Sequence, residues 1–160
     1  MSGSARPHVH AIGWATVELD RAAAELQGLL AAGASFAPAP DCELLGARCR
    51  VAALGEVALG ELARSVAASG ASAGVALPPR ARFVVLLEPS TEGRMANTLA
   101  RHGESWCATW TIEDAGSDPA ATLPRRTSER AGPFGPERLI LDSGFGGPHH
   151  LLLRAATIGT

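Results

Sequence analysis

The stretch HAIGWATVELDRAAAEL, residues 10–26, decides the fold, because its hydrophobic period changes once along its length. Its first half alternates, which predicts a strand, and its second half carries leucines at helical spacing. Asp20, at the change, is suited to cap a helix that we expect over residues 21–33. The strand face with the larger side chains carries His10, Ile12, Trp14 and Thr16. The opposite face is small enough to lie under the helix, so the chain is predicted to open with a strand and a helix packed together.

Further strand-like segments follow in an order that repeats once. Strands are predicted within residues 43–54 and at 82–89, 106–112, 137–142 and 149–156, and a break is expected at 34–40. The order of one strand, one helix and three strands, given twice, indicates a degenerate internal repeat. The predicted boundaries are a first module at 1–90 with an insertion around 61–80, a linker helix at 91–104, and a shortened second module at 105–160.

Composition excludes several classes of function. A chain of 160 residues with 46% hydrophobic and 19% charged residues should fold, and a net charge of -2 without a basic patch argues against a nucleic-acid partner. There is no lysine for a Schiff base and no tyrosine to act as an acid. The three cysteines show no CxxC spacing, so neither a disulfide framework nor a zinc knuckle is indicated. No apolar run is long enough to cross a membrane, and the expected location is the cytoplasm.

Three segments together resemble the vicinal oxygen chelate superfamily, which includes glyoxalase I, methylmalonyl-CoA epimerase and bleomycin-resistance proteins. They are the opening stretch already quoted, the inter-module link LLEPSTEGRMANTLARHGESWCATW at 86–110, and the ending ERLILDSGFGGPHHLLLRA at 137–155. The resemblance implies an α+β fold in which two βαβββ modules pair into a cup-shaped, partly open mixed sheet. It also implies a small-molecule ligand or substrate and is compatible with a homodimer.

The resemblance further implies four metal-ligand positions, one on the first strand and one on the last strand of each module. In this sequence they hold His10, Val85, Cys107 and Leu153 or Arg154. A divalent metal that chelates oxygen ligands requires histidine and carboxylate groups, which this set does not provide. The expectation is therefore a divergent, metal-free member without a cofactor. A nonstandard site of His10, Cys107 and one of His149 or His150 is kept as an alternative.

Several residues are candidates for a site in the cup. His10, Cys107 and Arg154 are the catalytic candidates: an acid or base, a thiol facing the cup, and an anion holder. Each also has a structural interpretation: a histidine partly buried at a strand start, an inert buried thiol, and an arginine paired with a glutamate such as Glu88. The substrate-binding candidates are Trp14, Val85, Thr109, Trp110 and Leu152, where the tryptophans either stack on a flat ligand or pack in the core.

Other polar features carry weaker signals. Only one of His149 and His150 can face the cup, because adjacent strand residues point to opposite sides. Glu43, Glu56 and Glu61 are candidate general bases if buried and ordinary surface residues otherwise. The glycine-rich SGFGG lacks the following helix that phosphate binding requires, so it is interpreted as a turn.

Two functions fit these features. The first is a metal-independent enzyme of the glyoxalase fold that acts on a medium-sized, partly apolar metabolite by proton transfer, as an isomerase, epimerase, cyclase or lyase. The all-arginine, alanine-rich composition is typical of high-GC bacterial genomes and favours natural-product biosynthesis, such as polyketide tailoring. The alternative is a non-catalytic binding protein of the bleomycin-resistance type. A buried group with a shifted pKa inside the cup would favour the enzyme.

Overall fold

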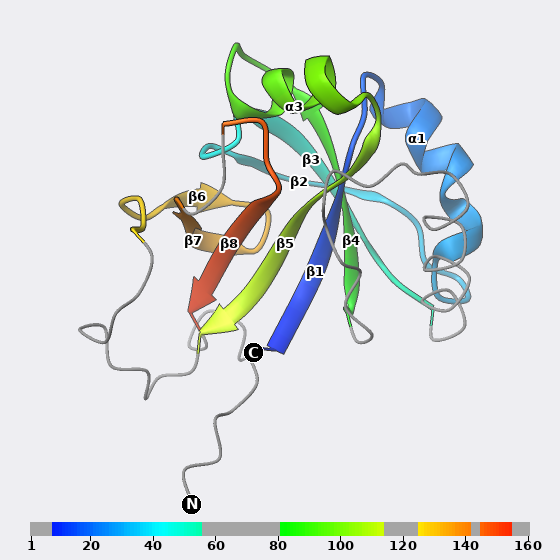
Figure 1. Ribbon diagram of the computed structural model, residues 1–160. Helices are drawn as coiled ribbons and strands as arrows, with labels where there is room; N and C mark the ends of the chain where they lie inside the picture. The colour runs from blue at the N-terminus through cyan, green and yellow to red at the C-terminus, as the bar shows by residue number, and fades with distance from the viewer. Residues whose placement is uncertain (1–7, 56–80, 114–124, 142–144, 155–160) are drawn as a thin grey trace, which may run out of the picture.

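The computed structural model describes residues 8–55, 81–113, 125–141 and 145–154, which form one eight-stranded mixed sheet with helices at its surface (Figure 1). The first half contains β1 (His8–Ala15), α1 (Leu19–Glu25), the 3-10 turn η1 (Gln27–Leu29), β2 (Ala37–Cys42), β3 (Ala47–Ala53) and β4 (Phe83–Pro89). The second half contains α3 (Arg94–His102), β5 (Ser105–Glu113), β6 (Arg130–Gly132), β7 (Gly135–Ile140) and β8 (His149–Arg154). The expected insertion around 61–80 lies outside the described residues, and the module boundaries stay predictions.

The order of strands across the sheet is β2-β3-β4-β1-β5-β8-β7-β6. The halves mirror each other, since β1 pairs with β4 in parallel and β5 pairs with β8 in parallel. The antiparallel pairing of β1 with β5 joins them at the centre. Curvature brings the two edges back together, where the Glu43 amide donates to the Ala131 carbonyl at 3.1 Å. The sheet is therefore a nearly closed cup, which confirms the predicted α+β fold class.

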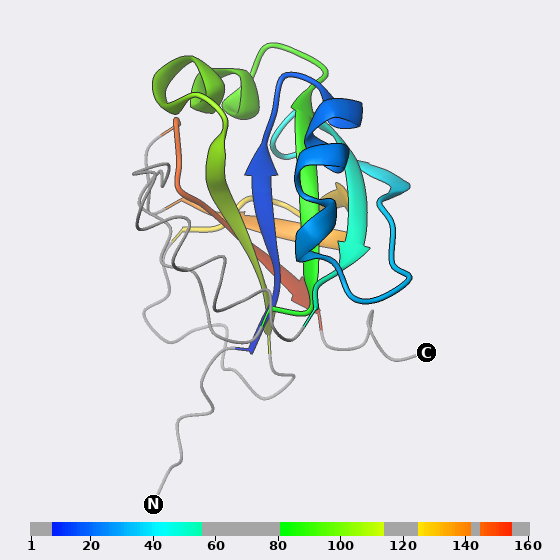
Figure 2. The same cartoon turned by 90° about the vertical axis from the view of Figure 1, so that its right-hand side faces the viewer.

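The outer face of the sheet is the side covered by α1 (Figure 2). Ile12 and Trp14 of β1 point to this side, where Trp14 packs edge-to-face on Trp106 with ring centroids 5.0 Å apart. Leu19 and Ala22 of α1 are buried against Leu86. The expected face assignment is therefore wrong: the larger side chains of β1 meet the helix. The helix also begins earlier and ends earlier than predicted, and its N-cap is Glu18 instead of Asp20.

The inner face needs the small residues of β1, because the β6–β7 hairpin crosses it (Figures 1 and 2). Ala11 and Ala15 belong to the inner core together with Trp110, Leu151 and side chains of both halves. A methyl group added at Gly13 would approach Trp110 and Leu87 to 2.9 Å. The alternation in the sequence thus predicts the strand β1 correctly. The small residues Ala11, Gly13 and Ala15 make room for the indole ring of Trp110, and the helix lies on the other face.

The edge strand β2 occupies residues expected to form a break. It pairs with β3 through Ala37, Pro38 and Ala39, and the register becomes irregular between Ala39 and Cys42, where Pro40 lies. Proline has no N–H, and edge strands are where a sheet tolerates it. The two prolines therefore leave β2 without backbone donors at these positions. We call the line where β2 and β6 meet the seam.

The helix α3 covers one end of the cup, where Met95 and Leu99 pack into the inner core (Figure 1). It connects β4 to β5, which agrees with the helix expected in the linker. The residue before the helix is Gly93. Among the described residues no helix has the length and apolar character that a membrane crossing requires.

Candidate functional site

A buried carboxylate lies inside the cup. Glu137 of β7 points inward with Leu139 and is only 1% exposed. Its two oxygens are hydrogen bonded to different donors: the Trp110 indole Nε1 donates to Oε2 at 2.7 Å, and the Cys42 thiol donates to Oε1 at 2.9 Å. Strands from both halves therefore hold this carboxylate, which is not among the site residues predicted from the sequence.

Burial determines the electrostatics of this group. It raises the pKa of Glu137, while the hydrogen bonds from Cys42 and Trp110 act in the opposite direction by favouring the ionised form. Gly132 makes the position possible, because a methyl group there would lie 2.1 Å from the Glu137 Cδ atom. A buried carboxyl with a raised pKa can take up and release a proton closer to neutral pH than a surface carboxyl can.

His10 faces the same interior because of a β-bulge. Val9 pairs with Thr111 and Ala11 pairs with Trp110, so His10 is an extra residue in β1 and leaves the face of Ile12. Its ring packs between Phe83, at 4.9 Å, and Phe134 of the β6–β7 turn, at 4.8 Å. It is 5% exposed, and burial, with Arg82 and His8 as smaller causes, lowers its pKa. Its Nδ1 atom is buried without a hydrogen-bond partner among the described residues.

These side chains form one continuous group. Phe134 contacts both His10 and Trp110, with the Phe134 and Trp110 centroids 6.0 Å apart, and Trp110 binds Glu137. The structure thus brings together two of the predicted residues, His10 and Trp110, with others that were not predicted. We call this group the interior cluster: His10, Cys42, Phe83, Trp110, Phe134 and Glu137.

Cys107 also points inward, through a second irregularity. The register shifts between Gly13 and Trp14 opposite β5, so Cys107 and Ala108 both join the inner core while Trp106 turns to the outer face. Trp106 and Trp110 are therefore on opposite faces of the sheet. Burial raises the pKa of the Cys107 thiol to about 12, which keeps it protonated and unreactive at neutral pH.

The four positions implied for metal ligands all lie on strands of the inner core: His10, Val85, Cys107 and Leu153. Two of the four are aliphatic, and a thiol with a pKa of about 12 is a poor thiolate donor. Among the described residues no three histidine, cysteine or acidic side chains gather closely enough to hold a metal ion. The donor set does not fit the metal that the resemblance implies.

Other predicted residues point outward. Arg154 is exposed, with 61% of its side chain accessible, and pairs with Glu129 at 3.1 Å instead of with Glu88, whose partner is Arg48. Thr109 is hydrogen bonded to His150 Nδ1 at 3.0 Å on the outer side of β5 and β8. Leu152 is half-buried beside Thr111. The catalytic role of Arg154 and the substrate-binding roles of Trp14, Val85, Thr109 and Leu152 stay predictions.

The two adjacent histidines of β8 separate as the strand geometry requires. His149 is buried, and its Nε2 atom lies 2.8 Å from the Thr98 hydroxyl of α3. Burial, with Arg94 and His150 nearby, lowers the pKa of His149 to about 4. Glu43 is an exposed residue at the end of β2, and Glu56 and Glu61 lie outside the described residues.

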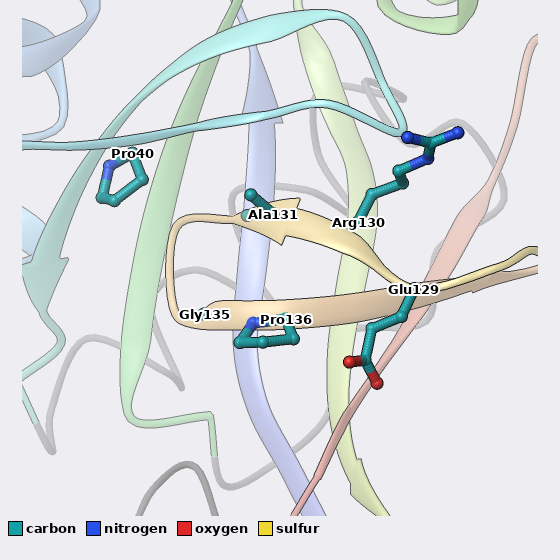
Figure 3. Close-up of a pocket in the computed structure, with 7 residues that line it drawn as sticks. Pro40, Glu129, Arg130, Ala131, Gly135 and Pro136 are labelled. Carbon is teal, nitrogen blue, oxygen red and sulfur yellow. The ribbon is translucent and has the colours of Figure 1, made fainter.

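A surface pocket of about 360 Å³ lies at the seam (Figure 3). Its walls come from Pro40 of β2, from the β6 residues Arg130, Ala131 and Gly132, and from Gly135 and Pro136 of β7, with Glu129 at one side. The proline and glycine residues make the lining of the pocket mostly apolar, and the glycines add no side chain to its walls.

Comparison with solved structures relates this fold to methylmalonyl-CoA epimerases. The enzyme from Mycobacterium tuberculosis is 18% identical over 91% of this chain and 86% of that chain, with a TM-score of 0.58. A variant of the Streptomyces coelicolor enzyme in complex with 2-nitronate-propionyl-CoA is 18% identical over 92% and 96%, with a TM-score of 0.61. A hypothetical protein from Bacillus halodurans is 13% identical over 93% and 94%, with a TM-score of 0.55.

The likeness concerns the fold. No protein-family model matches the sequence, and no curated protein does. At identities of 13% to 18% the solved structures show the fold alone, and a fold does not determine an activity.

Proposed function

We propose that this protein is a metal-independent isomerase of the glyoxalase fold, which moves a proton at a carbon next to a carbonyl group in a small, partly apolar metabolite. The observation that carries the proposal is the position of Glu137, a buried carboxyl in the cup with a raised pKa and two hydrogen-bond donors. A carboxyl group in such an environment can serve as a general base and acid.

The chemistry assigns one role to each of two groups. Glu137 takes the proton from carbon, and the electron pair of the C–H bond moves into the enolate, whose charge rests on the carbonyl oxygen. His10, neutral through its lowered pKa, offers a ring nitrogen without a partner as a hydrogen-bonding group for that oxygen. Return of the proton from Glu137 to the same or a neighbouring carbon restores the carbonyl and the resting carboxylate.

The solved structures with this fold are consistent with such a reaction. One of them is a methylmalonyl-CoA epimerase in complex with methylmalonyl-CoA and NH4+, at 17% identity and a TM-score of 0.56. We carry over only the class of reaction, proton transfer in an isomerase. Cytoplasmic location, a homodimer and a role in natural-product biosynthesis stay predictions.

The tryptophans do not separate the enzyme from the binding protein of the bleomycin-resistance type, because Glu137 is as deeply buried as Trp106 and Trp110. Trp14 and Trp106 pack against each other on the outer face, and the Trp110 indole is tied to Glu137 inside the core. Trp106 and Trp110 are 2% and 0% exposed, so neither presents an open ring face on which a flat ligand could stack.

Hydrogen exchange in deuterated buffer tests the proposal. Short methyl-branched acyl thioesters and 2-substituted ketones are incubated with the protein, and uptake of deuterium at carbon is followed by mass spectrometry. We expect Glu137→Gln to lower the exchange rate by about 10²–10⁴-fold. Glu92→Gln, at an exposed glutamate, should stay within about twofold of the wild type.

Two results would overturn the proposal: no exchange with any member of the panel, or exchange that persists in Glu137→Gln. Metal independence has its own measurement. Protein dialysed against a chelator should retain the full exchange rate, and stoichiometric metal in protein purified without chelator would contradict that part.

A further inference from the structure

We propose that the substrate carries a flat aromatic ring, and that this ring binds in the place that the Phe134 side chain holds in this structure. The inference rests on the proposed function, because it names the class of substrate that reaches Glu137. Three features of the described residues carry it: the aromatic surroundings of Phe134, the unpaired polar atom of the neighbouring His10, and the weak attachment of the turn that bears Phe134.

The Phe134 ring lies among three other ring systems. Its centroid is 4.8 Å from that of His10, 5.7 Å from that of Phe83 and 6.0 Å from that of Trp110. The contacts with His10 and Trp110 are edge-to-face, a geometry that aromatic rings prefer because the positive edge of one ring meets the negative face of the other. We call the space bounded by His10, Phe83 and Trp110 the ring site. Its walls favour a flat aromatic group over a saturated group of similar size.

His10 gives the ring site a polar atom that Phe134 cannot satisfy. The histidine is 5% exposed, and its Nδ1 atom is buried without a hydrogen-bond partner among the described residues. A phenyl ring offers no oxygen or nitrogen, and a buried polar atom without a partner destabilises the fold. A carbonyl group on a ligand ring can accept a hydrogen bond from Nδ1–H, and a hydroxyl group can donate one to a bare Nδ1. The ring site therefore suits an aromatic carbonyl compound.

The turn that bears Phe134 is attached to the rest of the sheet by few contacts. β7 pairs with β8 only as far as Glu137, so residues 130–136, the tip of the β6–β7 hairpin, extend beyond that ladder (Figure 1). Within the described residues the tip has one backbone hydrogen bond to the first half, from the Glu43 amide to the Ala131 carbonyl. If the tip moves outward as a unit, it breaks this hydrogen bond and the ring contacts, and the β7–β8 ladder stays intact.

Phe134 also lies where the interior meets solvent. Phe134 and Phe83 are half-buried, whereas His10 and Trp110, which Phe134 contacts, are buried. The Trp110 indole is hydrogen bonded to Glu137 at 2.7 Å. Outward movement of the tip therefore opens the ring site from the solvent side. A ligand ring that takes the place of Phe134 touches His10 directly and lies against the indole that holds the proposed catalytic carboxyl.

Fluorine NMR of protein labelled with 4-fluorophenylalanine follows this replacement in the wild-type fold. The chain has four phenylalanines, and Phe134→Leu identifies the signal of residue 134. Acetophenone is the probe, and cyclohexyl methyl ketone, which has a saturated ring of similar size and is the more apolar of the two, is its counterpart. We expect acetophenone to move the Phe134 signal, in a saturable way, toward its position in the unfolded protein. The saturated ketone should bind about 2–10-fold more weakly, and the Phe36 signal, from the outer face, should stay in place.

Phe134→Ala removes the occupant of the ring site. The open arrangement of the tip is a minor state in the wild type, populated at about 10% or less, so this variant should bind acetophenone about tenfold or more tightly. Phe145→Ala, at a phenylalanine that is 53% exposed, is the matched control and should bind acetophenone as the wild type does. Thermal unfolding checks that each variant is folded, and the wild-type titration does not depend on any variant.

Three results would overturn the inference: a Phe134 signal that stays in place at saturating acetophenone, equal or tighter binding of the saturated ketone, or an affinity of Phe134→Ala no higher than that of Phe145→Ala. The inference and the proposed function fail separately. Glu137→Gln should still show the Phe134 shift with acetophenone, so loss of deuterium exchange with this shift intact concerns the catalytic group alone. Deuterium exchange into a substrate that leaves the Phe134 signal in place refutes only the ring site.

Discussion

One added methyl group at Gly132 should destabilise the folded state by about 2–6 kcal/mol. The new Cβ atom would lie 2.1 Å from the Glu137 Cδ atom and 2.3 Å from each carboxylate oxygen, so the carboxylate must move. Overpacking of this kind costs about 1–3 kcal/mol. The movement also breaks the hydrogen bonds from Trp110 and Cys42 and leaves buried polar groups unpaired, which adds about 1–3 kcal/mol.

The prediction is measured by urea and thermal unfolding. For a chain of this length the loss corresponds to a fall in Tm of about 5–20 °C. Gly28→Ala is the control, because nothing lies within 4 Å of the added methyl group, and it should be neutral or stabilise the fold by up to about 1 kcal/mol. Combining Gly132→Ala with Glu137→Ala should cost less than the sum of the two single changes, by about 1–3 kcal/mol. Equal stability of Gly132→Ala and Gly28→Ala would refute the placement of the carboxylate.

Three further predictions concern other parts of the fold. Because the pKa of His149 is about 4 in the folded chain and about 6.5 in the unfolded chain, only the unfolded chain is protonated between these values. Stability should therefore fall by about 3 kcal/mol as the pH drops from 6.5 to 4, and urea unfolding of His149→Gln should show a smaller loss. Trp106→Ala should cost about 3–5 kcal/mol by the same method, and a double-mutant cycle with Trp14→Ala should reveal a coupling of about 0.5–1.5 kcal/mol; zero coupling contradicts the edge-to-face contact. All three cysteines should resist a thiol reagent in native buffer and react in urea, since each is buried with a raised pKa; rapid native labelling would contradict this.

The strands of this fold could be predicted because their periodicity is local. The segment RFVVLLEP, residues 82–89, indicates a buried strand by its apolar run, and it is β4. The faces of β1 and β5 could not be predicted in the same way. A bulge at His10 and a register shift beside Cys107 each move one side chain to the other face, and such irregularities depend on the partner strand and leave no mark in the alternation.

The candidate site was predicted only in part. His10 and Trp110 were found through the resemblance and through residue type, and both lie in the interior cluster. Glu137 did carry a signal, because strand alternation puts it on the same face as Leu139 in the segment ERLILD. A glutamate on a leucine face needs a buried partner, and its donors, Cys42 and Trp110, are 95 and 27 residues away along the chain. Only the closure of the sheet brings them together.

The prolines of β2 also determine where the closed sheet can come apart. Neighbouring strands elsewhere in the sheet are paired as ladders, whereas β2 and β6 meet at the hydrogen bond from Glu43 to Ala131. The free energy of local opening should therefore be smallest at this line, and amide protons of β6 should exchange with solvent sooner than those of β1 or β5. Local opening of the sheet between β2 and β6 would give molecules from solvent one fixed direction of approach to the interior.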